Sequence, residues 1–411
     1  EGVLLGVRAS LPVDLQRPLI GALRWTARSS ASELSRPPLP TYPSIEMNAA
    51  MPTMATNGIQ ELSEGPLDIV GDVHGEYDAL VSLLKKLGYD DLGRHREGRR
   101  LVFVGDLIDR GPDSPAALRA VKRMVEAGNA QCVAGNHEIN AIRDQADQER
   151  SGEGWWYGRN EAPYASVVVD PREKEESFLP FLRALPGALE CADLRVVHAC
   201  WHEPSIDRLR GASTVIDAFR SEAEANKKNL EGLGLALRAR ASVENFEWRR
   251  IKDENTKLEF IPEIAAYDEA NQMGNAIKVA TSGVERAARD SYWASGKWRM
   301  VERVPWWDEY EGPPVVVGHY WRRYQPNVKH ASSKRNSDLF GDTLPHETLG
   351  PAGQVMCIDF SVGMRFLERN RARPSVPERF ESCLAALRLP EWQLVFDDER
   401  PSLNVEIQPR N

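Results

Sequence analysis

Five short apolar segments of the sequence each end in polar residues that can bind a metal ion. The motifs are GDVHG at 71–75, GDLIDRG at 105–111, GNHE at 135–138, VHA at 197–199 and GH at 318–319. Their donors are oxygens and imidazole nitrogens, a set that suits Mn, Fe, Zn or a similar divalent ion. Six donors exceed what one ion needs, so we predict two ions that share one carboxylate, held by Asp72, His74, Asp106, Asn136, His198 and His319.

A pair of ions of this kind has a defined chemistry. Two metals about 3.5 to 4 Å apart activate a shared water and hold the oxygens of an in-line displacement. Two divalent ions outweigh the negative charges of Asp72, Asp106 and a bridging hydroxide by about one positive unit. Asn136 and the histidines are neutral ligands and preserve that surplus. The composition of the site therefore predicts an anionic substrate, namely a phosphate ester.

The segments that precede the motifs are expected to be strands that position them. LDIVGD, RRLVFVGD, AQCVAGN, LRVVHA and PPVVVGH each have the pattern of a buried strand. Helices are expected between the first three, at 76–88 and at 114–128, the second with Ser114 as its N-cap, Pro115 in its first turn and Gly128 at its end. This alternation predicts parallel strands whose carboxyl ends share one edge of a sheet, where all five motifs converge.

The rest of the chain is divided by its composition. Residues 1–60 are rich in Pro, Ser and Ala and are expected to form a disordered tail, with a transit peptide or an over-extended reading frame as alternatives. We assign 61–411 to one catalytic domain, in which the charged stretch 204–275 is a helical insertion or cap. Strand patterning resumes at AIKVATSG, and QVMCIDFSVG and LAALRLPEWQLVFDDE are expected to form two more strands around a short helical turn.

Composition excludes several classes of protein. The 411 residues are 42% hydrophobic and 27% charged, as in an ordinary globular protein. The formal charge of -9 argues against broad nucleic-acid binding, so phosphate must be attracted by a local positive site. No apolar run approaches the roughly 18 residues of a membrane span. Five cysteines without a CxxC pair predict neither a disulfide framework nor a zinc ribbon, and a cytoplasmic location is expected.

Taken together, the motifs resemble a known family. GDVHG, GDLIDRG and GNHE followed by two separated histidines are similar to the PPP-type phosphoprotein phosphatases of the calcineurin-like metallophosphoesterase superfamily, in particular their bacterial branch, over roughly 67–389. The resemblance implies an α/β fold, a β-sandwich of two mixed sheets flanked by helices. It also implies that Asp72 and His74 hold the first metal, that Asp106 bridges, and that Asn136, His198 and His319 hold the second.

The resemblance implies catalytic roles as well. His137 would protonate the leaving alkoxide, Asp109 would orient that imidazole, and Arg110, with Asn136, would bind the substrate phosphate. The implied reaction is attack of metal-bound hydroxide on phosphorus without a phosphoenzyme, with two Mn ions favoured and Fe or Zn as alternatives. The family uses one further phosphate-binding arginine, and four candidates stay open: Arg299, Arg303, Arg322 and Arg323.

The sequence departs from the family pattern at two places. His198 is followed by Ala199 and Cys200 where the family has Gly-Gly or Ala-Gly, and His319 is followed by Tyr320 where bacterial relatives often have Thr. Both changes preserve the metal ligands, but they alter the floor of the site.

The substrate is less defined than the metal site. Symmetrical diadenosine tetraphosphatases share the scaffold and usually lack the Asp of the DRG motif, so Asp109 favours phosphomonoesters, such as phosphoproteins. The alternative is a nucleotide phosphohydrolase, acting on dinucleoside tetraphosphates or polynucleotide ends. Its base could stack on aromatic residues near the motifs, namely Trp155, Trp156, Tyr157, Trp306 and Trp307. A third alternative, an inactive binding module, would require the loss of a ligand or of His137, and none is lost.

Overall fold

The computed structural model describes residues 58–143, 156, 166–244, 248–294, 296–324, 339–341, 343–372 and 379–407. The predicted tail therefore lies outside the described residues as far as position 57, and so do Trp155 and Tyr157. The last residues assigned to the tail form part of strand β1 (Ile59–Glu61), which pairs with β5 (Ala188–Glu190).

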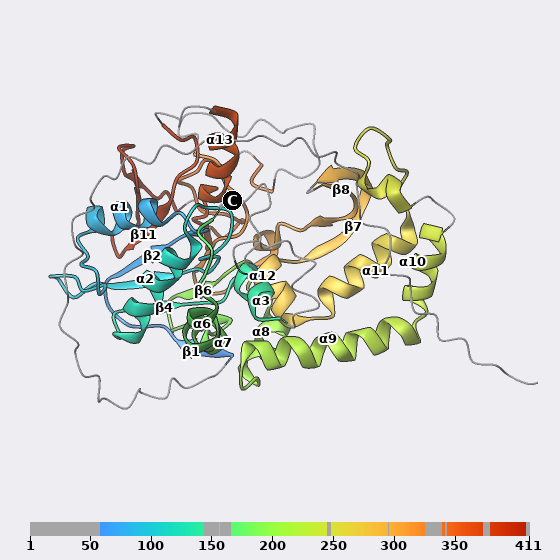
Figure 1. The fold of residues 1–411 in the computed structure, drawn as a ribbon, viewed down its shortest axis with the longest axis horizontal. Coiled ribbons are helices and arrows are strands. Elements are labelled where there is room, and N and C mark those ends of the chain that lie inside the picture. The colour runs from blue at the N-terminus through green and yellow to red at the C-terminus, as the bar shows by residue number, and fades with distance from the viewer. Residues whose placement is uncertain are drawn as a thin grey trace, which may run out of the picture. The chain divides into compact units, whose positions relative to one another are not determined.

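Two mixed sheets form the framework of the fold (Figure 1). The six-stranded sheet has the order β13-β12-β11-β2-β3-β4, with β2 (Leu67–Val70), β3 (Arg100–Phe103), β4 (Ala130–Cys132), β11 (Ala385–Leu389), β12 (Gln393–Phe396) and β13 (Leu403–Asn404). The five-stranded sheet has the order β1-β5-β6-β9-β10, with β6 (Arg195–Val197), β9 (Val315–Val317) and β10 (Val355–Cys357). The α/β fold with two mixed sheets is thus confirmed.

The two sheets pack on each other, and their strands β2, β9 and β10 are buried on both faces. Ile69 and Val102 of the first sheet share one apolar cluster with Val196 and Val316 of the second. The alternate residues of the same strands, such as Val70, belong to another cluster that includes the inner faces of helices. Near-continuous apolar runs are the signature of strands covered on both sides.

The motifs belong to both sheets and not to one. Strands β2, β3 and β4 are parallel neighbours in the six-stranded sheet, whereas β6 and β9 are parallel neighbours in the five-stranded sheet. The prediction that all five motifs lie at one sheet edge was therefore wrong. The periodicity of a strand indicates that both its faces are buried, but it does not identify the strand's neighbours.

The two predicted helices are present, with one correction. Helix α1 (Tyr77–Leu87) buries Leu80, Leu83, Leu84 and Leu87, and α2 (Ser114–Glu126) is followed by Gly128 at a φ of 74°. The N-cap of α2 is Asp113, whose carboxylate accepts a hydrogen bond from the Ala116 N–H at 2.9 Å. The Ser114 hydroxyl accepts instead from the Asp109 N–H, so the prediction of Ser114 as the cap was wrong by one residue.

Helices fill most of the stretch between β6 and β9, as the sequence predicted for 204–275. They are α8 (Glu203–Arg210), α9 (Val215–Gly232), α10 (Leu235–Glu244), the 3-10 turn η2 (Trp248–Lys252), α11 (Pro262–Met273) and α12 (Ala276–Ser282). Helix α11 packs on the hairpin of β7 (Glu285–Ala294) and β8 (Lys297–Arg303), where Leu258, Ile261, Ala265 and Met300 form a small core (Figure 1).

Short elements complete the described chain. After β4 come α3 (Asn136–Ile142), α6 (Pro171–Glu173), the π-helix η1 (Lys174–Phe178) and α7 (Leu179–Ala184). The 3-10 turn η3 (Trp306–Glu309) precedes β9, and the 3-10 turn η4 (Val362–Met364) and α13 (Arg365–Ala372) follow β10.

Two segments differ from the predicted strands. AIKVATSG forms helix α12, because the Asn275 side chain caps it by accepting from the N–H groups of Ile277 and Lys278. Its apolar residues are buried against α8 and α9, and a short buried helix has the same apolar run as a strand. LAALRLPEWQLVFDDE forms the antiparallel hairpin β11–β12, so it contains two strands where one was expected.

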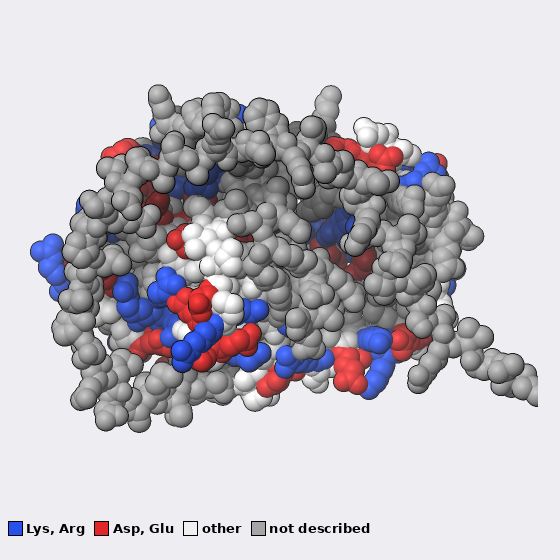
Figure 2. Space-filling model, viewed as in Figure 1, with Lys and Arg blue, Asp and Glu red and all other residues white. Residues whose placement is uncertain are grey.

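Charges of both signs are interspersed on the face seen in Figure 2. Surface ion pairs join residues of opposite charge, such as Arg119 with Glu173 at 2.7 Å and Lys228 with Glu224 at 3.0 Å. All five cysteines are free, which confirms the absence of a disulfide framework. Among the described residues, no helix combines the length and the apolar character that crossing a bilayer requires.

Candidate active site

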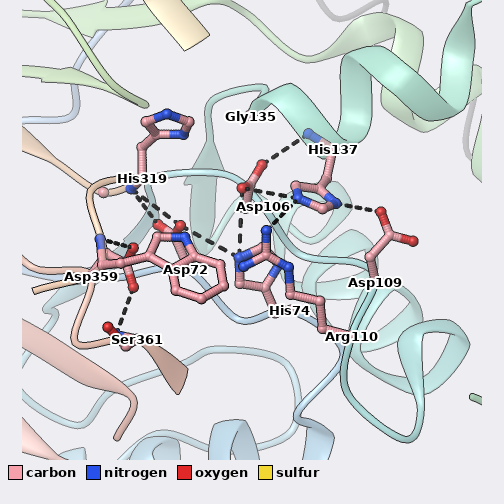
Figure 3. Close-up of polar contacts among 12 residues, drawn as sticks. Asp72, His74, Asp106, Asp109, Arg110, Gly135, His137, His319, Asp359 and Ser361 are labelled. Atoms are coloured by element: carbon pink, nitrogen blue, oxygen red, sulfur yellow. Dashed lines mark hydrogen bonds and ion pairs between the residues drawn. The ribbon is translucent and has the colours of Figure 1, made fainter. Parts of the chain in front are cut away.

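The loops after five strands bring the predicted metal ligands together, and Figure 3 shows four of them, Asp72, His74, Asp106 and His319. Asp72 and His74 follow β2, Asp106 follows β3, Asn136 begins α3 after β4, His198 follows β6 and His319 follows β9. Asp72, His74, Asp106, His198 and His319 are all buried. Residues that are far apart in the sequence and unusual in a protein interior thus converge at the ends of both sheets.

Asp106 lies at the centre of this group. Its Oδ2 is 3.6 Å from His74 Nε2 and 3.3 Å from His198 Nε2. Its Oδ1 accepts a hydrogen bond from the His137 N–H at 3.0 Å, which fixes the carboxylate. One oxygen of Asp106 therefore lies between two separate sets of donors, as the prediction of a bridging ligand requires.

The first set contains Asp72 and His74. His74 Nδ1 is 3.1 Å from the Ile108 carbonyl oxygen and donates to it, so Nε2 carries the lone pair. This Nε2 is buried, has no hydrogen-bond partner among the described residues and lies 3.7 Å from Asp72 Oδ2. A buried imidazole nitrogen beside two carboxylates, with its lone pair free, fits a divalent cation.

The second set contains Asn136, His198 and His319. Asn136 Oδ1 is 2.9 Å from His319 Nδ1 and 3.3 Å from His198 Nε2. His198 Nδ1 lies 2.8 Å from the Val104 carbonyl oxygen, which again leaves Nε2 to act as a ligand. Ligands about 2.0 to 2.2 Å from one ion lie roughly 3 to 3.5 Å from each other, so these donors fit a second divalent ion.

Electrostatics favour cations at both positions. Burial raises the pKa of Asp72 well above its usual value, and the nearby charges of Asp359 and Asp106 raise it further. Burial alone would lower the pKa of His198, but Asp106 and Asp72 raise it to about 10. Two positive ions would relieve the repulsion among the carboxylates and restore both side chains to their ligand forms.

The backbone is strained where it presents the ligands. His74, Asp106 and His319 have positive φ angles of 46°, 48° and 69°. Non-glycine residues rarely adopt this region, and they concentrate at functional sites where surrounding contacts hold them. Glycine is required beside them: a Cβ on Gly318 would lie 2.0 Å from Asp72 Oδ1.

His137, Asp109 and Arg110 lie on one side of Asp106. His137 Nδ1 forms a short contact with Asp109 Oδ2, and its Nε2 is 3.8 Å from Asp106 Oδ2 and 3.3 Å from Arg110 Nη2. Burial alone would lower the pKa of His137, but the charges of Asp106 and Asp109 outweigh it and raise this pKa. An imidazole that is oriented by a carboxylate and has a raised pKa is suited to donate a proton.

A comparison with known protein families matches the segment that contains the first four motifs. The sequence model described as calcineurin-like phosphoesterase matches residues 65–225, which include Asp72, His74, Asp106, Asn136 and His198. The chain is therefore similar to calcineurin-like phosphoesterases over residues 65–225. The resemblance found from the motifs is thereby confirmed.

Individual relatives resemble parts of this chain. The asymmetrical bis(5'-nucleosyl)-tetraphosphatase PrpE of Halalkalibacterium halodurans is 52% identical over 73 residues, which are 17% of this chain and 30% of that protein. The enzyme of the same name from Geobacillus thermodenitrificans is 45% identical over 159 residues, 35% of this chain and 60% of that protein. The chain thus spans between 30% and 60% of the length of these two curated relatives.

Solved structures give a weaker likeness. The crystal structure of a putative diadenosine tetraphosphatase is 16% identical to this chain, with a TM-score of 0.37, and the comparison covers 85% of this chain and 98% of that one.

Glu138 is part of the GNHE motif, but no role was predicted for it. Its carboxylate accepts hydrogen bonds from three backbone N–H groups, those of Asp106, Leu107 and Gly135, each at 2.8 Å. Burial and the neighbouring charge of Asp106 raise the pKa of Glu138 to about 7. Glu138 therefore ties the loop that carries Asp106 to the start of α3, which carries Asn136.

Asp359 and Trp321 were not among the predicted site residues. Asp359 is buried and accepts hydrogen bonds from the N–H groups of Trp321 and Ser361, each at 2.8 Å. The Trp321 ring lies against the Arg110 guanidinium, 4.1 Å from centroid to Cζ. A signal was available for Asp359, since QVMCID is a sixth apolar segment that ends in a polar residue. No sequence pattern marked Trp321.

The four arginines that were candidates for the further phosphate-binding residue have different environments in the structure. Arg299 pairs with Glu285 at 3.2 Å, and Arg322 is buried and donates to carbonyl oxygens, including that of Glu347 at 3.0 Å. Arg323 is exposed and lines a cavity together with Trp321. Arg303 lies over the Tyr320 ring at 5.7 Å. Burial lowers the pKa of His319 and the charge of Arg303 lowers it further, so Arg303 acts electrostatically on one of the predicted metal ligands.

The aromatic residues that were predicted to stack on a nucleobase pack inside the protein, in the part of the chain that the structure describes. Trp306 and Trp307 are buried and pack in T-shaped contacts on Tyr310 and Tyr320, and Trp156 is also buried. These rings are part of the core and offer little surface for a nucleobase.

Proposed function

We propose that this chain is a phosphoric ester hydrolase that uses two divalent metal ions. The observation that carries the proposal is the position of Asp106 Oδ2, within 3.6 Å of donor nitrogens from both sets. Asp72, His74 and Asp106 would hold one ion, and Asp106, Asn136, His198 and His319 the other. When bound, the ions supply positive charge for the phosphate oxygens and activation of a water molecule.

The chain's own residues position the phosphate and move the proton. Arg110 has two buried guanidinium nitrogens, Nε and Nη1, without a hydrogen-bond partner among the described residues, so it is free to grip phosphate oxygens. His137 donates a proton from Nε2 to the leaving oxygen, while Asp109 holds the ring through Nδ1. Arg303, which lies over the ring of Tyr320 next to His319, is our candidate for the second phosphate-binding arginine.

Two substrate classes have support. Asp109 at the position usually lost in symmetrical diadenosine tetraphosphatases favours phosphomonoesters, including phosphoproteins. The curated relatives named asymmetrical bis(5'-nucleosyl)-tetraphosphatase favour a dinucleoside tetraphosphate, over the part of the chain that they match.

A substrate panel tests the proposal. The purified protein is loaded with Mn and assayed with an aryl phosphate, a phosphopeptide, a dinucleoside tetraphosphate, and RNA ends with a 3'-phosphate or a 2',3'-cyclic phosphate. We expect hydrolysis that is abolished by chelation and restored by added Mn, and the largest kcat/KM identifies the class. Activity that survives exhaustive removal of metal, or the hydrolysis of none of these esters, would contradict the proposal.

Arg303→Ala tests the second arginine. We expect kcat/KM for the best phosphate ester to fall by about 10- to 100-fold, because a charged hydrogen bond to phosphate contributes roughly 1.5 to 3 kcal/mol. Arg299→Ala is the matched control, since Arg299 lies on the same strand and pairs with Glu285. The measurement is the steady-state kcat/KM of both variants. An equal loss of kcat/KM in the two variants, or a larger loss for Arg299→Ala, would show that Arg303 does not bind the phosphate.

A further inference from the structure

A cavity of about 730 Å³ adjoins the candidate site and takes no part in the function described so far. Its volume is in the range of small-molecule sites. We call it the arginine cavity, and its walls are Trp321, Arg323, Tyr324, Phe360, Ser361, Met364, Glu368, Arg371, Arg379, Phe380, Glu381, Ser382 and Arg400.

The charges of the arginine cavity favour an anion. Four arginines line it against two glutamates. Arg400 is paired with Asp398, and the Glu368 carboxylate accepts from the Ser382 hydroxyl and from the Glu381 N–H. Arg323, Arg371 and Arg379 are exposed and form no ion pair with any described residue. These three guanidinium groups are available to a ligand with several negative charges.

The cavity shares a wall with the candidate site. Trp321 lines the cavity, and its ring also packs on the Arg110 guanidinium. Ser361 lines the cavity as well, and its N–H and that of Trp321 both donate to Asp359. Trp321 is two residues beyond His319. A substrate with its reacting phosphorus at Arg110 and Asp106 would therefore have room to extend past the indole of Trp321 toward Arg323, Arg371 and Arg379.

We propose that the arginine cavity binds the leaving part of a nucleoside polyphosphate substrate. Arg323, Arg371 and Arg379 would hold its phosphates, and the Trp321 ring would stack on its base. This inference rests on the proposed hydrolase function and gives it a substrate class. A nucleotide combines several phosphates with a flat ring, and arginines beside aromatic rings complement both parts.

The reaction is balanced without a further reactant. The oxygen of water forms a bond to phosphorus, and the bond from that phosphorus to the bridging oxygen of the polyphosphate breaks. The electron pair leaves with the bridging oxygen, and the two protons of water go to solvent or to the products. The leaving group is a phosphate anion, which the arginines of the cavity stabilise directly, so this substrate depends little on a proton from His137.

The test is a double variant, Arg371→Ala with Arg379→Ala, assayed on diadenosine tetraphosphate and on an aryl phosphate too small to reach the cavity. We expect the ratio of kcat/KM for the dinucleotide to that for the aryl phosphate to fall by about 10- to 100-fold, as for loss of charged hydrogen bonds to phosphate. The matched control, Arg119→Ala with Arg172→Ala, removes two exposed arginines of α2 and α6 and should leave this ratio unchanged.

Direct binding separates this proposal from the proposed function. Calorimetric titration of the same proteins with diadenosine tetraphosphate should give a Kd that is about 10-fold higher or more for the cavity variant, whether or not turnover occurs. An unchanged Kd and an unchanged ratio overturn the proposal. So does an equal loss on both substrates, or a loss that appears for an acidic phosphopeptide and not for the dinucleotide. If the wild type hydrolyses aryl phosphate but neither binds nor hydrolyses the dinucleotide, the hydrolase function stands and the nucleotide assignment fails.

Discussion

Asp106→Asn is expected to lower kcat by at least about 1,000-fold and to reduce the metal content from two ions per chain to one or none. The size follows from the several kcal/mol of transition-state stabilisation that a metal pair supplies. A carboxylate oxygen carries the negative charge that two cations share, whereas an amide oxygen is neutral and its NH2 group repels a cation. Asparagine can still accept the His137 N–H, so the loop should keep its shape.

Metal analysis by mass spectrometry, kinetics on an aryl phosphate and circular dichroism check this prediction. Asp90→Asn is the control, because Asp90 is an exposed residue that pairs with Arg94 away from the site. A variant with wild-type metal content and activity would refute the dinuclear arrangement.

His137→Asn should have a large effect that depends on the leaving group. Proton donation contributes about 100- to 10,000-fold to such reactions. We expect kcat for an alkyl phosphate or a phosphoserine peptide to fall within that range, because an alkoxide leaves poorly without a proton. An activated aryl phosphate needs no proton and should lose much less.

The pH profile gives a second measurement of the role of His137. Asp106 and Asp109, acting against burial, raise the pKa of His137 above its usual 6.5. The acid form therefore persists above that pH and is lost as the pH rises through the raised pKa. The alkaline limb of kcat for poor leaving groups should lie above pH 6.5 in the wild type and be absent from the variant. Equal losses on both substrate types would show that His137 is not the acid.

The site was predictable from sequence where one short motif carries both the strand and the ligand. GDVHG, GDLIDRG and GNHE contain the residues that the structure brings together around Asp106. The glycines beside them permit close approaches that any Cβ would block, as at Gly318. Local chemistry of this kind is readable in a single sequence.

Contacts between distant segments were not readable. The sheet to which β6 belongs depends on its pairing with β9, more than 100 residues later, and no local pattern records this. Arg303 and Arg322 look alike in sequence, but one lies over Tyr320 and the other is bound to carbonyl oxygens. Helix α12 was misjudged because the cap supplied by Asn275 outweighed the strand-like pattern of Ile277 and Val279.

The origin of the ligands in two different sheets has a consequence for stability. Asp72, Asp106 and Asn136 follow strands of the six-stranded sheet, while His198 and His319 follow strands of the five-stranded sheet. An ion held by both groups would cross-link the two halves of the sandwich, and it would bind far less well to the unfolded chain. Such an ion would stabilise the fold by about 2.7 kcal/mol when free metal is about 100 times its Kd. The supply of metal would then set how long the folded protein persists, as well as how fast it works.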